Sequence, residues 1–173
     1  MTLTLKTGAI LAAILLLSAC SATQDRLHTA STAGPASGIS SGPLGDPADP
    51  ASVAYFNETI GDRVLFEVDQ HTLTPSGETV LASQADWLSR NPEYAAIIEG
   101  HADEQGTREY NLALGARRAS SVQNFLIARG VAPSRLRTVS YGKERPLAVC
   151  SEESCYQQNR RAVTVLNAGA LGS

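Results

Sequence analysis

The sequence predicts an α/β domain: one mixed β-sheet with two main helices packed on it, in the order β-α-β-α-β-β. Three observations support this. Runs of β-branched and aromatic residues alternate with segments of helical spacing between residues 63 and 166. Helix start and stop signals separate these segments. About 120 residues remain after the N-terminal region, which is enough for one domain with a single core.

The first strand and helix lie between residues 63 and 91. Arg63 to Val68 is a β-branched and aromatic run and predicts a strand. Thr74 then precedes Pro75, the pattern of an N-cap before proline at the first helical position. Apolar residues follow at helical spacing until Asn91, which precedes a second proline. The segment 53–60 fits either a short helix or an edge strand.

The remaining elements follow the same alternation. Residues 95–98 are apolar without alternation, which predicts a central strand covered on both faces. A polar loop then leads to a helix over 107–129, which Gly130 ends. Residues 136–141 and 161–166 predict the last two strands. The expected buried stripe of the long helix is Leu112, Ala119, Val122, Phe125 and Leu126.

The N-terminus has the pattern of an export signal. Lys6 is followed by a nine-residue apolar run, Ala9 to Leu17, and small residues then lead to Cys20. This pattern resembles the lipobox of bacterial lipoproteins, in which the signal peptide (1–19) is removed and the cysteine is lipidated. The alternatives are an ordinary signal peptide with a chance cysteine, or an uncleaved helix. The run is too short for the latter, since a bilayer takes about 20 residues.

Residues 20–52 are rich in Ala, Ser, Thr, Gly, Pro and Asp. Such a segment cannot bury enough apolar area to offset backbone ordering, so we expect a lipidated N-terminus and a disordered tether. As a flexible coil it would span roughly 30 Å; the alternative is filler with no required reach. The folded domain is then expected over 53–167, with a flexible tail at 168–173.

Composition and motifs exclude several functions. The net charge is −3 and no dense basic patch occurs, which argues against nucleic acid as the partner. His101 and Asp103 could ligate a metal, but no His/Cys cluster accompanies them, so a hydrogen-bonded structural histidine is favoured. No activated serine or cysteine stands beside a histidine at a recognisable catalytic spacing. We therefore expect no enzyme activity, no metal and no cofactor.

Once Cys20 is assigned to the anchor, two of the three cysteines remain. In an oxidising compartment Cys150 and Cys155 are expected to form a disulfide that pins the connection 143–158. Zinc binding is the alternative, but two isolated cysteines are too few for a structural zinc site.

Several short motifs together resemble the OmpA-like peptidoglycan-binding domain, from about residue 64 to residue 165. They are Gly100-His101-Ala102-Asp103, Asn111, Arg117-Arg118-Ala119, Gly130-Val131, Ser140-Tyr141-Gly142, Pro146 and Asn159-Arg160-Arg161. With the lipobox and the tether, they fit the lipoprotein branch of that family better than its barrel-linked or motor-stator branches. This branch implies binding to the peptidoglycan stem peptide and partnership with TolB in the Tol–Pal system. It also implies a role in outer-membrane invagination at division, and a monomeric domain in the periplasm. Ser21, rather than an acidic residue, follows the lipidated cysteine, which favours the outer membrane.

The resemblance also implies the binding residues. The family's ligand is the diaminopimelate branch of the stem peptide, which ends in an ammonium and a carboxylate on one carbon. The motif assigns Asp103 to the ammonium and Arg118 to the carboxylate, which a planar guanidinium can bind with two parallel hydrogen bonds. A structural ion pair is the alternative for these two residues. Asn111, seven residues before Arg118, either contacts ligand or braces the loop.

Three further positions belong to the implied site. Asp69, Thr72 and Leu73 follow the first strand, where the family's other binding loop lies; Asp69 would orient that loop, and the backbone of the other two would meet ligand carboxylates. Arg161 begins the last strand, with a structural role as the alternative to binding.

The sequence leaves three candidate functions. A lipid-anchored binding module predicts co-sedimentation with purified sacculi and no turnover. A wall-remodelling amidase or peptidase, using His101 and Asp103 around a metal, predicts bound metal and release of soluble muropeptides. A lipoprotein that binds only protein partners predicts no sedimentation. The motifs favour the first.

Overall fold

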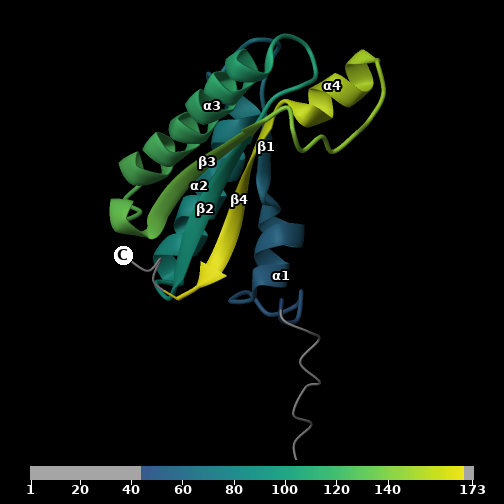
Figure 1. The fold of residues 1–173 in the computed structure, drawn as a ribbon. Helices are drawn as coiled ribbons and strands as arrows, with labels where there is room; N and C mark the ends of the chain where they lie inside the picture. The colour runs from purple at the N-terminus through teal and green to yellow at the C-terminus, as the bar shows by residue number, and fades with distance from the viewer. Residues whose placement is uncertain (1–43, 170–173) are drawn as a thin grey trace, which may run out of the picture. The chain divides into compact units, whose positions relative to one another are not determined.

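The computed structural model describes residues 44–169 (Figure 1). The predicted signal peptide, the lipidation site Cys20 and most of the predicted tether lie outside these residues, as do residues 170–173 of the predicted tail. The elements in chain order are α1 Val53–Tyr55, the π-helix η1 Phe56–Gly61, β1 Arg63–Leu65, α2 Pro75–Arg90, β2 Tyr94–His101, α3 Arg108–Ala128, the 3₁₀-helix η2 Pro133–Arg135, β3 Leu136–Gly142, α4 Glu153–Asn159 and β4 Arg161–Ala168.

The predicted fold class and the order of strands and main helices are confirmed. The ambiguous segment 53–60 is helical, as α1 and η1. The first strand is shorter than predicted and ends at Leu65, although the amide of Phe66 still donates to the carbonyl of Arg160 at 2.8 Å. A seven-residue helix between the last two strands, α4, was not predicted from the sequence.

The sheet has the strand order β1-β4-β2-β3. β2 runs parallel to β3 and antiparallel to β4, and β1 is antiparallel to β4. The register places Gly100 opposite Ser140 on one side and Ala162 on the other. The carboxyl ends of β2 and β3 therefore meet the beginning of β4 at one edge of the sheet.

The helices α2 and α3 cover the same face of this sheet. Gly100 backs onto α3, since a Cβ there would lie 1.9 Å from the carbonyl oxygen of Gly115. The hydroxyl of Thr164 donates to Oε1 of Gln84 on α2 at 2.8 Å, and Thr164 pairs with Ile98 on this same face. α2 lies behind the strands in Figure 1.

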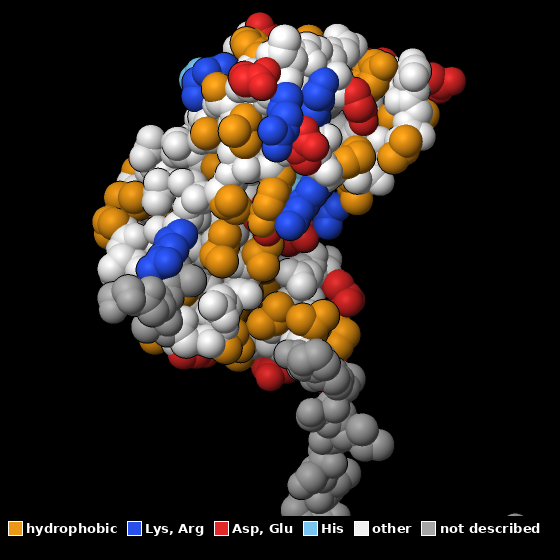
Figure 2. Space-filling model, viewed as in Figure 1, with side chains coloured by type: hydrophobic (Ala, Val, Ile, Leu, Met, Phe, Trp, Pro, Cys, Tyr) orange, Lys and Arg blue, Asp and Glu red, His pale blue; other side chains and the backbone are white. Residues whose placement is uncertain are grey.

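The expectation that the central strand is covered on both faces is wrong for the described residues. Ile97 and Glu99 point away from the helices and are only half-buried, and Val165, opposite Ile97, is 39% exposed. Figure 2 shows this face, with hydrophobic side chains along the strands and Lys or Arg side chains among them. The apolar run 95–98 shows no alternation because Ile97, on the open face, is also apolar and stands between the buried Ala96 and Ile98.

Residues 44–52, which we assigned to the tether, form turns that contact the domain. The indole Nε1 of Trp87 donates to the carbonyl of Pro50 at 2.7 Å, and Ser52 caps α1 by accepting from the amide of Tyr55. The Trp87 ring packs against Phe56, with ring centroids 5.0 Å apart. The ordered region thus begins upstream of residue 53.

The buried face of α3 differs from prediction at its N-terminal end. Ala119, Val122 and Leu126 are buried as expected, and Phe125 is partly buried. Leu112, however, is 49% exposed. The inward positions of the first turns are taken instead by four other residues: Asn111, Leu114, Gly115 and Arg118.

Candidate functional site

A hollow of about 300 Å³ lies at the carboxyl end of β2, where the loop after β1, the loop after β2 and the first turns of α3 meet. Open α/β sheets commonly bind ligands at such an edge. Its lining residues are Val68, Asp69, Asp103, Gln105, Gly106, Tyr110, Asn111, Leu114 and Arg118. Four predicted site residues, Asp69, Asp103, Asn111 and Arg118, therefore line one hollow.

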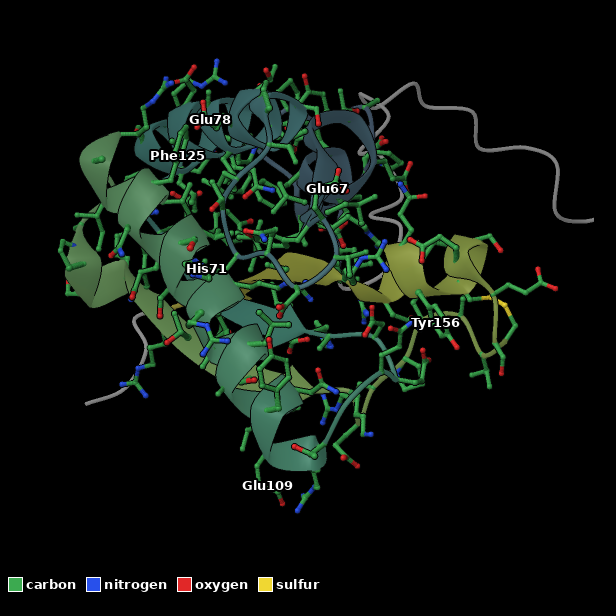
Figure 3. The ribbon with its side chains drawn as sticks, turned by 90° about the horizontal axis from the view of Figure 1, so that it is seen from above. Glu67, His71, Glu78, Glu109, Phe125 and Tyr156 are labelled. Carbon is green, nitrogen blue, oxygen red and sulfur yellow. A yellow bond between two sulfur atoms is a disulfide. The ribbon has the colours of Figure 1, made fainter. Side chains whose placement is uncertain are left out.

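Arg118 is fully buried and holds the two loops together. Its Nε donates to the carbonyl of Gln70 at 2.8 Å, Nη1 to that of His101 at 2.8 Å, and Nη2 to that of Glu67 at 3.2 Å. Figure 3 shows the loop with Glu67 and His71 beside α3. A guanidinium has five N–H groups, so these three bonds leave two for other acceptors.

The charge of Arg118 survives this burial. Burial lowers the pKa of Arg118 to about 10, the largest effect, while the negative charge of Asp103 opposes that shift. At neutral pH the side chain is therefore a buried cation in the wall of the hollow, with Phe66 5.2 Å from the guanidinium carbon.

Asp103 contributes the opposite charge and is 8% exposed. Its Oδ1 accepts from the amide of Gln105 at 3.3 Å, and its Oδ2 pairs with Nη1 of Arg160 at 3.2 Å. Asp103 thus forms a structural ion pair, as the alternative interpretation allowed, but with Arg160 and not with Arg118. Asp103 and Arg118 present their charges separately to one space.

Of the adjacent residues Arg160 and Arg161, only Arg160, which was not a predicted site residue, binds a residue of the hollow. Arg161 does not line the hollow: its Nη2 donates to the carbonyl of Arg145 at 3.2 Å, and burial followed by the charge of Arg63 lowers its pKa. Arg160 instead reaches Asp103. Consecutive residues at a strand end point to opposite sides, so only one of the pair can reach this site.

Asn111 is buried, and its Nδ2 donates to the carbonyl of Gln105 at 2.8 Å. This bond braces the loop after β2, and Asn111 also lines the hollow. Thr72 is exposed, Leu73 packs partly against the apolar core, and neither lines the hollow.

Tyr110 is a site residue that sequence reasoning missed. Its hydroxyl donates to Oδ1 of Asp69, and this bond raises the pKa of Tyr110. Asp69 has a φ of 57°, in the left-handed region, at the turn after β1. The only sequence signal for Tyr110 was its position next to Asn111 at the start of the long helix.

His101, the last residue of β2, is 1% exposed, and its Nε2 lies 3.7 Å from Oε2 of Glu99. Neither ring nitrogen has a hydrogen-bond partner among the described residues, so the expectation of a hydrogen-bonded histidine is wrong. Burial, and then the charges of Arg161 and Arg145, lower its pKa to about 4, so the ring is neutral at pH 7. The ring packs against Tyr141 with centroids 5.5 Å apart. Within residues 44–169, no group of three or more His, Cys, Asp or Glu side chains could hold a metal ion.

The segment before β4 is closed by a disulfide and is joined to the loop after β2 by Asn159. A disulfide joins Cys150 to Cys155, with Cα atoms 5.8 Å apart. Oδ1 of the buried Asn159 accepts from the amides of Leu147 and Ala148 at 2.7 and 3.1 Å. Its Nδ2 donates to Oε1 of Glu104, in the loop after β2, at 2.7 Å.

Comparison with known proteins agrees with this fold. Residues 65–161 match the OmpA family. In the part of the chain that the structure describes, no helix is both long and apolar enough to cross a membrane.

Several proteins similar to this chain share one name. The peptidoglycan-associated lipoprotein of Mesorhizobium japonicum is 57% identical over 120 residues, which cover 69% of this chain and 71% of the relative. That of Agrobacterium fabrum is 53% identical over 124 residues, or 72% of this chain and 70% of the relative. The crystal structure of the peptidoglycan-associated lipoprotein from Burkholderia pseudomallei matches with 37% identity and a TM-score of 0.63, over 72% of this chain and 99% of that one.

Proposed function

The chain belongs to the OmpA family and, within it, to the peptidoglycan-associated lipoproteins, and from this premise we propose that its domain binds peptidoglycan non-covalently in the hollow at the end of β2. The observation that carries the proposal is the pair of opposite charges, Asp103 and Arg118, lining one hollow. The protein acts by binding and is not an enzyme.

The proposed ligand group is the zwitterionic end of the diaminopimelate branch. Its ammonium would donate to Asp103, whose two oxygens each have a lone pair beyond those that meet Gln105 and Arg160. Its carboxylate would accept from the N–H groups of Arg118 that the loop carbonyls leave unused. Both bonds are charge-assisted and form in a partly dehydrated site, where they are stronger than in water.

The loops around the hollow support this role. Tyr110 holds Asp69 on the rim, and Asn111 holds the carbonyl of Gln105, so both loops are braced before ligand arrives. The N-terminus of α3, with Thr107 as its N-cap, faces the same region and adds partial positive charge suited to a carboxylate. The backbone of Thr72 and Leu73 would meet more distant parts of the stem peptide.

The cellular role follows from anchoring this domain. Lipid on Cys20 would hold the protein in the outer membrane, and the tether would place the domain in the periplasm within reach of the wall. Such a link would support membrane integrity and draw the outer membrane inward at division. By family membership we propose TolB as the protein partner in the Tol–Pal system.

Co-sedimentation with purified sacculi tests the binding site. Asp103→Ala removes the acceptor for the ammonium, and we expect about a tenfold or greater loss of affinity, the size of one charge-assisted hydrogen bond. Arg118→Lys keeps the charge but loses the planar fork, and we expect a similar loss. The matched control is Arg117→Ala, the exposed neighbour on α3, which should sediment like wild type.

Two results would decide against the proposal. If Asp103→Ala keeps its circular dichroism spectrum and still sediments like wild type, the site is elsewhere. If incubation with sacculi releases soluble muropeptides, the wall-remodelling enzyme is the better description.

A further inference from the structure

Arg160 joins two carboxylates of different exposure. Nη1 donates to Oδ2 of Asp103 at 3.2 Å, Nη2 donates to Oε1 of Glu153, and Nε donates to the carbonyl of Phe66 at 3.2 Å. The side chains of Arg160 and Asp103 are 3% and 10% exposed, whereas that of Glu153 is 64% exposed. Each nitrogen of the guanidinium thus has a partner, which holds its plane in one orientation.

Glu153 lies within the loop that the disulfide closes. Glu153 is the first residue of α4 and lies in sequence between Cys150 and Cys155. α4 projects from the edge of the sheet, with Tyr156 and the sulfur–sulfur bond on its far side in Figure 3. Asn159 clips the base of this segment to the amides of Leu147 and Ala148, and the disulfide closes its outer end.

We propose that Arg160 is a positioning residue for Asp103, and that Glu153, held by the Cys150–Cys155 disulfide, tunes the affinity of the hollow for an ammonium group. This inference rests on the proposed function and adds a specificity and redox control to the same site. Arg160 and Glu153 act through Asp103 and need not touch the ligand.

The physical reason is the division of one cation between two anions. While Nη2 is bound to Glu153, Asp103 receives a single N–H from Arg160 and its remaining lone pairs face the hollow. If the Glu153 carboxylate is removed or moves away, the potential at Asp103 becomes more positive and the guanidinium is free to turn both terminal nitrogens toward it. A ligand ammonium then competes with an undivided Arg160 charge and binds more weakly.

Calorimetric titration of the mature chain with a stem tripeptide ending in meso-diaminopimelate tests this control. Glu153→Gln should weaken binding about two- to tenfold, the range for coupled neighbouring groups, without lowering the melting temperature measurably. Glu153→Asp should recover part of the affinity. Glu152→Gln, the adjacent exposed carboxylate without a side-chain cap bond, is the matched control and should bind like wild type.

Two further variants separate positioning from a general structural effect. Arg160→Lys keeps the charge but cannot meet two carboxylates with a planar fork, so it should bind more weakly. In the Arg160→Lys background, Glu153→Gln should have no further effect if Glu153 acts through Arg160. An equal loss from Glu153→Gln in both backgrounds would overturn the inference.

The same titration tests whether reducing the Cys150–Cys155 disulfide changes the affinity. Reduction of the disulfide, or Cys150→Ser with Cys155→Ser, should weaken binding by about the same factor as Glu153→Gln and should not add to it. The double serine variant should be insensitive to reductant. If mass spectrometry shows both thiols alkylated after reduction and the affinity is unchanged, the disulfide does not tune the site. If instead Asp103→Ala binds like wild type, the proposed function itself fails.

Discussion

The two halves of α3 bury different chemistry on one continuous face. Toward the C-terminus, Val122 and Leu126 face the apolar core. Toward the N-terminus, the inward positions hold Asn111 and Arg118, whose polar groups bond to loop carbonyls. The helix therefore anchors the fold at one end and builds the hollow at the other, and buried polar side chains at inward positions distinguish the site end from the core end.

Matched leucine substitutions give the largest expected contrast. Leu126→Ala should lower the free energy of unfolding by about 2–5 kcal/mol, because Leu126 is fully buried and its loss leaves a cavity. Leu112→Ala should change it by less than about 0.5 kcal/mol, because Leu112 is half-exposed. Urea unfolding of both variants measures the difference. Equal losses would mean that the first turns of α3 bury the stripe that the sequence predicted.

Acid should weaken the site end through His101. The folded state lowers the pKa of His101 from 6.5 to about 4, so the folded state holds fewer protons than the unfolded state between these values. The free energy of unfolding is therefore unaffected by titration of His101 above about pH 6.5, and it decreases as the pH falls from 6.5 toward 4. We expect about 2–3 kcal/mol less stability at pH 4.5 than at pH 7 from this residue.

The control for that prediction is His101→Gln, which cannot titrate. Urea unfolding of both proteins at the two pH values isolates the histidine contribution from that of the carboxylates. A variant with the same pH dependence as wild type would exclude His101 as the source.

Gly115 marks the junction between the two halves. A Cβ at this position would lie 2.4 Å from Oγ of Ser140 and 2.8 Å from the carbonyl oxygen of Gly100, so Gly115→Ala must push α3 away from the sheet. We expect a loss of about 1–3 kcal/mol of stability. The exposed Gly130, whose Cβ would meet nothing within 4 Å, has a left-handed φ of 97° and tests backbone strain alone. Thermal unfolding of Gly115→Ala and Gly130→Ala separates crowding from strain.

Asn111→Ala should have the smallest effect of the four. It removes one hydrogen bond to the carbonyl of Gln105, worth about 1 kcal/mol of stability. Asn124→Ala, an exposed asparagine on the same helix, should be nearly neutral. Hydrogen exchange of the amides over 103–107 measures whether the loop is released. A loss of sacculus binding as large as that of Asp103→Ala would instead assign Asn111 to ligand contact.

Local signals predicted the main elements well. Thr74 and Thr107 each cap a helix by accepting from the amide three residues later, Gly77 and Tyr110 respectively. These contacts involve neighbours in sequence, so composition and spacing carry the information. α4 lacked such a signal, because it is short and its position depends on the disulfide and on Glu153 bonding to Arg160.

The candidate site was predictable to the extent that family motifs specify residue types. The motifs predicted Asp69, Asp103, Asn111 and Arg118, and the structure brings these four together. They did not predict which donor and acceptor atoms of these residues already form hydrogen bonds within the protein. The sequence does not show this, because two of the three carbonyls that bind Arg118 come from Glu67 and Gln70, 51 and 48 residues away in the chain.

The sequence by itself determined the alternation of strands and helices, the N-cap of α2 at Thr74, the end of α3 before Gly130 and the polar residues available to the site, because each depends on neighbours in the chain. Only the tertiary structure decided which of Arg160 and Arg161 meets Asp103, and that Leu112 is turned outward while Arg118 is buried. Those outcomes depend on the strand pleat and on loops from distant parts of the chain, which meet only when the sheet edge and α3 come together.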